Sequence, residues 1–139
     1  MIHRHEIRVR YGETDQMGVV HHRVYALYFE EARTELMRAL GLSYAGLEKR
    51  GIFLPVVELS VRFRKGPAYD AVLVVESRLS ELSRVRMRLD YRAIDREDGS
   101  LVAEGYTVHA STDPNMRLTR IPGDVAEMFR AVIEEGAWE

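Results

Sequence analysis

The feature that most constrains the fold is a change in the spacing of apolar residues partway along the chain. From about His22 to Leu40, apolar side chains recur at every third or fourth position, which is the period of an amphipathic helix. Gly41 follows directly and suits a left-handed helix cap. From Val57 onward, apolar residues instead alternate with polar ones, which is the period of a strand. The chain is therefore predicted to combine one long helix with a sheet.

Strand-like segments flank this helix on both sides. HEIRVRY, near the N-terminus, alternates and predicts a first strand. The later predicted strands lie at 57–63, 71–79, 85–94 and 101–112, and MRLTRIP at 116–122 suits a short edge strand. Turn signals between them, such as Asp98-Gly99, favour antiparallel hairpins. The sheet should therefore contain five or six antiparallel strands.

Two shorter helices complete the prediction. Ser43 suits the N-cap and Gly51 the terminator of a short second helix or turn between them. Pro122 suits the first turn of a C-terminal helix, in which an apolar stripe recurs at helical spacing. The whole pattern indicates the α+β class, with one long helix packed on one antiparallel sheet.

Length and composition limit the domain organisation and the compartment. The chain has 139 residues and no internal repeat or linker, which fits a single domain over residues 1–139. The longest apolar runs, such as AVLVV, are far too short to span a bilayer, and MIHRHEIR lacks the apolar stretch of a signal peptide. We therefore expect a cytoplasmic protein without a membrane span.

Composition also excludes several kinds of chemistry. The absence of cysteine rules out disulfides, thiolate nucleophiles and cysteine-bound zinc. The five histidines lack any metal-binding spacing, so we expect no metal. No phosphate-binding glycine loop or dinucleotide fingerprint occurs, and a net charge of −2 gives no general attraction to nucleic acid. We therefore expect no cofactor and no nucleic-acid partner.

The connection between the first strand and the long helix carries the residues best suited to chemistry. Glu13, Asp15, His21 and His22 surround Gly18 in this short segment. Connections of this kind are where a rigid scaffold usually presents functional groups. If the helix begins near His22, its unpaired N–H groups and positive dipole end point toward the loop that carries Asp15. Such an arrangement could stabilise negative charge on a reacting carbonyl oxygen.

This segment resembles a known family signature. RVRYGETDQMGVVHHRVYALYFEEARTE, residues 8–35, resembles the motif of hotdog-fold acyl-CoA thioesterases, specifically the 4-hydroxybenzoyl-CoA thioesterase and Tol-Pal-associated group. VVELSVRFRKGPAYDA and LVAEGYTVHASTD also resemble strands of that family, so the resemblance covers nearly the whole chain. It implies a hotdog fold, in which the sheet wraps around a long central helix and dimerises through its edge.

The resemblance also assigns roles to two residues. It implies that Asp15 is the catalytic carboxylate and that the backbone N–H of His22 binds the thioester carbonyl, with the His22 ring as a second catalytic group in one branch. Asp15 could attack the carbonyl to give a mixed anhydride, or it could activate a water molecule. Glu13 and His21 are interpreted as solvated loop residues.

Two carboxylates of the long helix are weaker candidates for the site. Glu30 or Glu31 could supply a second carboxylate near the thioester, as a helix acid does in other hotdog branches. The alternative, which we favour, is that they pair with Arg33 or Arg38 on the helix surface.

Two groups of basic residues could bind the phosphates of coenzyme A. Arg86 and Arg88 belong to a stripe at strand period on one face of the segment 85–94, and Arg64 and Lys65 precede the turn KGPAYD. Such stripes are usually solvated, but the resemblance implies a surface site for coenzyme A, and arginine suits phosphate. Coenzyme A would then enter as part of the substrate.

We therefore predict an acyl-CoA thioesterase, with an acyl carrier protein as the alternative carrier and the acyl group left open. A hotdog hydratase or dehydratase and a non-catalytic acyl-binding module are the alternatives. Because one antiparallel sheet leaves exposed edges that invite pairing, we expect a homodimer as the minimal active unit and a homotetramer formed from two dimers.

Overall fold

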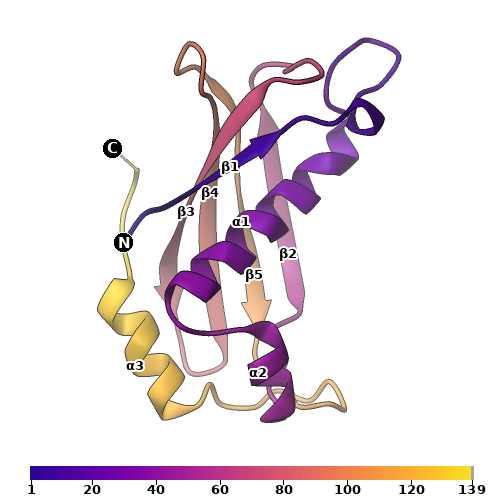
Figure 1. The fold of residues 1–139 in the computed structure, drawn as a ribbon. Coiled ribbons are helices and arrows are strands. Elements are labelled where there is room, and N and C mark those ends of the chain that lie inside the picture. Colours follow the sequence, from indigo (N-terminus) through magenta and orange to yellow (C-terminus); the bar gives the residue numbers. More distant parts are fainter. Residues whose placement is uncertain (139) are drawn as a thin grey trace.

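A computed structural model describes residues 1–138 (Figure 1). In chain order its elements are β1 (His3–Arg8), η1 (Tyr11–Glu13), η2 (His22–Val24), α1 (Tyr25–Ala39), α2 (Tyr44–Lys49), β2 (Val56–Phe63), β3 (Val72–Leu82), β4 (Arg86–Asp95), β5 (Leu101–Ala110) and α3 (Gly123–Val132), of which η1 and η2 are single 3₁₀ turns. Among these described residues, no helix is long and apolar enough to cross a membrane.

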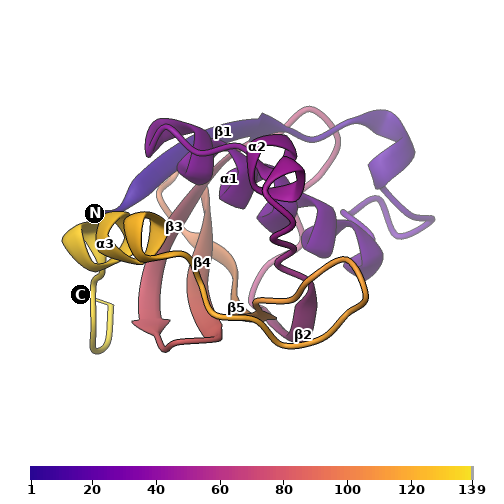
Figure 2. The same ribbon diagram turned by 90° about the horizontal axis from the view of Figure 1, so that it is seen from below.

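The strands form one antiparallel sheet in the order β1-β3-β4-β5-β2. The pairs β3–β4 and β4–β5 are hairpins, whereas β2 pairs with β5, so the connection 64–71 crosses from one edge of the sheet toward the other. Seen along the strands, the sheet curves around α1 (Figure 2). The predicted α+β class and antiparallel sheet are confirmed.

The predicted edge strand at 116–122 is wrong. Within this segment only Leu118 forms a bridge, to Thr112. The cause lies at Asp113, whose carboxylate accepts the backbone N–H groups of Asn115 and Arg117 and so folds the chain into a tight loop. The sheet consequently has five strands rather than six.

The core lies between α1 and the sheet. The apolar face predicted from helical spacing is buried, with Phe29, Ala32 and Leu36 each no more than 2% exposed. The Phe29 ring stacks on Tyr91 of β4 with centroids 4.4 Å apart. Beneath it lies Gly105 of β5, where a Cβ would clash with the Ser60 backbone and lie 3.0 Å from the Phe29 ring. Burying an aromatic side chain such as that of Phe29 stabilises the fold by about 2–3 kcal/mol.

The ends of the helices follow the sequence closely, with one exception. Gly41 and Gly51 adopt positive φ angles of 79° and 78°, and the Ser43 hydroxyl accepts the Gly46 N–H, as predicted. The long helix does not begin directly at His22, because a 3₁₀ turn precedes α1. The His21 ring accepts the N–H of Arg23 and closes this tighter turn.

Candidate active site

Residues 13–21 form a small hairpin between β1 and α1. Glu13 accepts the N–H of His21, Thr14 bridges Val20, and the Asp15 N–H donates to Val19, so the two arms run antiparallel. The turn at its tip contains Gly18, whose φ of 82° favours glycine. Asp15 therefore lies on the first arm of the hairpin, and His22 follows directly after the second arm.

The connection 64–71 supports this hairpin from the sheet side. The Val20 N–H donates to the Pro67 carbonyl at 2.9 Å. Gly66 lies so close to Val19 that a Cβ at this position would be 2.7 Å from a Val19 methyl carbon. A larger side chain at Gly66 would therefore push the hairpin away from the sheet.

The Asp15 carboxylate has one committed oxygen and one free oxygen. Its Oδ1 accepts the Met17 N–H at 2.9 Å, which is an Asx turn within the hairpin. Among residues 1–138, no donor binds Oδ2. The side chain is half-buried. The Asx turn therefore fixes the direction of the carboxylate while leaving Oδ2 able to attack an electrophile or bind water.

His22 presents a backbone donor at the start of the helical segment. Within the described part of the chain, its N–H has no hydrogen-bond acceptor. It lies at the end of the helix where unpaired N–H groups and the positive end of the dipole favour negative charge. Its ring is exposed, and its centroid lies 4.0 Å from that of His21. No hydrogen bond joins the His22 ring to Asp15 among the described residues.

The interpretation of Glu13 and His21 as solvated loop residues is wrong. His21 is half-buried and caps the turn η2 through its Nδ1 atom. Glu13 Oε1 accepts both the Arg10 N–H at 2.8 Å and the hydroxyl of Tyr28 at 2.9 Å. Burial, together with the Glu13 carboxylate, raises the pKa of Tyr28 above its ordinary value, so this hydroxyl stays protonated and acts as a donor.

Sequence reasoning missed the Glu13–Tyr28 pair as part of the site. The two residues are 15 positions apart, and no local spacing rule relates a loop acid to a tyrosine in the first turn of a helix. The only sequence signal is that Tyr28 adjoins the apolar stripe of α1 and should therefore turn its hydroxyl toward the sheet or the loop.

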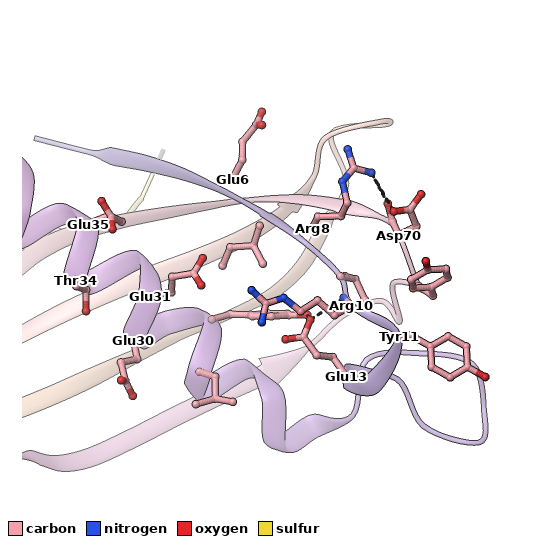
Figure 3. Close-up of a pocket in the computed structure, with 15 residues that line it drawn as sticks. Glu6, Arg8, Arg10, Tyr11, Glu13, Glu30, Glu31, Thr34, Glu35 and Asp70 are labelled. Carbon is pink, nitrogen blue, oxygen red and sulfur yellow. Dashed lines mark hydrogen bonds and ion pairs between the residues drawn. The ribbon is translucent and has the colours of Figure 1, made fainter.

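A groove of about 900 Å³ lies between β1 and α1, next to the hairpin (Figure 3). Glu13 and Tyr28 line its end, whereas Asp15 is not among its lining residues. Carboxylates dominate its walls: Glu6, Glu30, Glu31, Glu35 and Asp70 accompany only Arg8 and Arg10. Because this surface is acidic, it should repel the phosphates of coenzyme A.

The two helix acids do not pair as predicted. Glu31 binds His5 of β1, with 2.6 Å between Oε2 and Nε2. Arg33 is buried and donates to the hydroxyls of Tyr44 and Tyr91. Arg38 instead lies 3.4 Å from Glu35. The predicted pairing of Glu30 or Glu31 with these arginines is therefore wrong.

The basic residues predicted to bind phosphate fall into two separate groups. Arg64 pairs with Glu104, and Lys65 pairs with Asp98, at the end of the sheet where β2 stops and β3 begins. This is also the end that carries the hairpin, since Val20 bonds to Pro67 of the same connection.

Arg86 and Arg88 lie at the opposite end of the sheet. The register pairs Arg86 with Ala110, whereas the end of β4 near Lys65 is Asp95, nine positions away. That separation is roughly 30 Å of strand. Arg88 also donates to Asp90 and stacks over the Tyr106 ring. The two groups therefore cannot bind the same phosphate.

The edge strand β2 carries exposed apolar side chains. Val57, Leu59 and Phe63 of the edge strand β2 are between 47% and 54% exposed, which is unusual for large apolar side chains on a strand.

Among residues 1–138, no group of three or more His, Cys, Asp or Glu side chains is arranged to hold a metal ion.

Comparison with known proteins finds similarity to thioesterases. A model of the thioesterase-like superfamily matches residues 9–129. The candidate acyl-CoA thioesterase YneP of Bacillus subtilis is 34% identical over 108 residues, covering 78% of each chain. The solved structure of a DHNA-CoA thioesterase from Staphylococcus aureus is 32% identical, with a TM-score of 0.88 over 96% of this chain and 97% of that one. A hypothetical protein from Thermus thermophilus is 43% identical, with a TM-score of 0.89 over 95% of this chain and 98% of that one.

Proposed function

We propose that this chain, which belongs to the thioesterase-like superfamily, has the hotdog fold and is a thioester hydrolase, hydrolyses acyl-CoA through the Asp15 carboxylate and the His22 N–H. The observation that carries the proposal is their joint placement. One hairpin holds an aspartate with a free oxygen and leads directly into the 3₁₀ turn η2 ahead of α1, and the first N–H of that turn has no acceptor among the described residues.

The chemistry follows from these two groups. The substrate carbonyl oxygen accepts the His22 N–H, and the positive end of the helix dipole stabilises the negative charge that develops there. Asp15 Oδ2 then attacks the carbonyl carbon, or it removes a proton from a water molecule that attacks instead. In either route the carbon–sulfur bond breaks, and coenzyme A leaves as a thiolate that takes up a proton. We propose that the exposed His22 ring supplies this proton.

The two routes differ in where oxygen from water first appears. In a single turnover in ¹⁸O-water, hydrolysis of an aspartyl anhydride at the aspartyl carbonyl places the label in Asp15. A water molecule activated by Asp15, like water that attacks the acyl carbonyl of the anhydride, places the label only in the released acid, so label in Asp15 is the outcome that identifies the anhydride. Mass spectrometry of the peptide that contains Asp15 distinguishes these outcomes.

The proposed carrier is coenzyme A rather than an acyl carrier protein. The support is that YneP and the DHNA-CoA thioesterase are named for coenzyme A thioesters, whereas two plant relatives with 30% and 28% identity are named for acyl carrier protein thioesters. Of the two predicted basic groups, Arg64 and Lys65 are the better placed, because they lie at the same end of the sheet as the hairpin. The acidic groove along α1 should disfavour both coenzyme A and an acidic carrier protein on that side, so it does not distinguish the two carriers.

We also propose that the active unit is a homodimer joined through β2. This strand is an edge of the sheet, and its apolar side chains are half exposed. Pairing two copies of β2 would continue the sheet and remove this apolar surface from water. Association of two dimers into a tetramer stays a prediction.

Thiol release tests the proposed function directly. The wild-type protein should release free thiol from members of a panel of short, medium, long and aromatic acyl-CoAs, and it should leave the double bond of an enoyl-CoA unhydrated. Hydration without thiol release, or saturable binding with neither reaction, would contradict the proposal.

A further inference from the structure

Among residues 1–138, a single side-chain hydrogen bond joins the hairpin to the body of α1. The Tyr28 hydroxyl donates to Glu13 Oε1 at 2.9 Å, and Tyr28 is only 3% exposed. Glu13 is two residues before Asp15, and Tyr28 lies in the first turn of α1. The bond therefore connects the arm that carries Asp15 to α1, which follows directly after the 3₁₀ turn that supplies the His22 N–H.

The other contacts of this arm are weaker restraints on its position relative to the helix. The backbone bonds between 13–15 and 19–21 hold the two arms together but do not fix the hairpin against α1. The Arg23 side chain reaches the Gly12 carbonyl at 3.2 Å, but Arg23 is exposed to solvent. The Glu13–Tyr28 bond has a buried donor and a carboxylate acceptor, which is the stronger combination.

We propose that Glu13 and Tyr28 are positioning residues, which set the distance and angle between the Asp15 carboxylate and the His22 N–H during thioester hydrolysis. This inference rests on the proposed function. Glu13 itself is not a candidate catalytic base, because its Oε1 accepts both the Tyr28 hydroxyl and the Arg10 N–H. Small displacements of a reacting group are costly, and a shift of about 1 Å can reduce the rate by about a hundredfold.

Two substitutions remove the bond from either side. Tyr28→Phe keeps the ring and removes only the hydroxyl, while Glu13→Ala removes the acceptor. Each should lower kcat by about tenfold and change KM for acyl-CoA by less than about twofold, because the contact acts on the geometry of the reacting groups rather than on substrate binding. Glu13→Gln retains an oxygen that can accept the hydroxyl, so it should restore most of kcat.

The double variant tests whether the two residues act through one contact. If they do, Tyr28→Phe combined with Glu13→Ala should be no slower than the slower single variant. Multiplied effects, near a hundredfold, would overturn the proposal, because they would show that each residue acts independently.

Tyr106→Phe is the matched control. The Tyr106 hydroxyl donates to Glu58 Oε1 at 2.7 Å, which is the same kind of bond between β5 and β2, with no contact to the hairpin. This variant should keep the wild-type kcat. A loss equal to that of Tyr28→Phe would overturn the proposal.

Hydrogen exchange gives a readout that does not depend on activity. The Asp15 and Gly18 amides bond within the hairpin, and they should exchange faster in Tyr28→Phe and Glu13→Ala, while amides of β4 remain as protected as in the wild type. Unchanged exchange together with unchanged kcat in these two variants would overturn the positioning role of Glu13 and Tyr28. It would do so even if Asp15→Asn is inactive, because that result concerns the proposed function and not this contact. If the wild type releases no thiol, the proposed function fails, and exchange alone decides whether the pair holds the hairpin.

Discussion

At the scale of residues, the turn role and the catalytic role of Asp15 are compatible. Oδ1 holds the Asx turn through Met17, and Oδ2 faces no donor among the described residues. A structural contact therefore orients the carboxylate instead of competing with catalysis. The backbone and the ring of His22 can likewise have separate roles, because binding of the carbonyl oxygen by the backbone N–H does not require the ring.

Substitution of His22 separates the backbone donor from the ring. His22→Ala keeps the N–H and should lower kcat by less than about tenfold. His22→Pro removes the N–H and should lower kcat by about a hundredfold to a thousandfold, which is the usual cost of losing an oxyanion donor. Proline suits this position because it begins a helical turn and the preceding His21 has an extended backbone, with ψ of 141°.

Steady-state kinetics of both variants, with thermal unfolding as the control for folding, measure this difference. Equal activity of the alanine and proline variants would show that the His22 N–H does not bind the carbonyl oxygen.

The sequence predicted Asp15 and His22 because the motif places both on a short connection. It did not predict the Glu13–Tyr28 bond or the caps formed by His21, since these depend on how the hairpin folds back on α1. It also left Arg64 with Lys65 and Arg86 with Arg88 as equally eligible phosphate sites, because strand length and pairing register are needed to see that the two groups lie at opposite ends of the sheet.

At the scale of elements, β2 is an edge strand that leaves large apolar side chains exposed to solvent in a single chain. Leu59→Arg places a charge on its exposed apolar edge, where Leu59 is 47% exposed. In a dimer joined through β2 this charge would be buried without a partner, so the variant should dissociate. Light scattering should then show a particle of 16.0 kDa, with thiol release largely lost.

Leu118→Arg is the matched control for this prediction. Leu118 is 61% exposed but lies in the loop after β5, so the substitution should leave both assembly and turnover unchanged. A Leu59→Arg protein that remains dimeric and active would contradict dimerisation through β2.

The helix ends were predictable because caps are local. Gly41, Ser43 and Gly51 each act within one turn of their own position. The strand order was not, because β2 pairs with β5 over a long sequence separation, as in Leu59 with Thr107. Alternation alone does not identify the partner of a strand.

At the scale of the whole molecule, a buried polar chain crosses the core. Arg33 donates to the Tyr91 hydroxyl, which binds Thr107, which in turn contacts His109. The other ring nitrogen of His109 bonds to the Leu54 carbonyl, and the residue is 1% exposed. Burial lowers the pKa of His109 to about 4, and the nearby Arg33 acts in the same direction.

This burial predicts a loss of stability in mild acid. Because the folded pKa lies below the unfolded value of 6.5, the unfolded state binds the proton first as pH falls. The free energy of unfolding should therefore fall by about 2 kcal/mol between pH 7 and pH 5 from this residue alone. Denaturant unfolding at both pH values measures it, and His109→Gln should show a smaller fall. An identical pH dependence in the variant would contradict the assignment.

The central claim, that Asp15 is the catalytic carboxylate, is tested most directly by kcat of Asp15→Asn. Asparagine keeps an oxygen that can accept the Met17 N–H, so the turn, the melting temperature, the oligomeric state and the binding of a non-hydrolysable thioether analogue should all be unchanged. The catalytic role predicts that kcat falls by about a hundredfold to ten-thousandfold. A variant that keeps more than about a tenth of the wild-type kcat would contradict the claim and make Glu30 or Glu31 of α1 the next candidate.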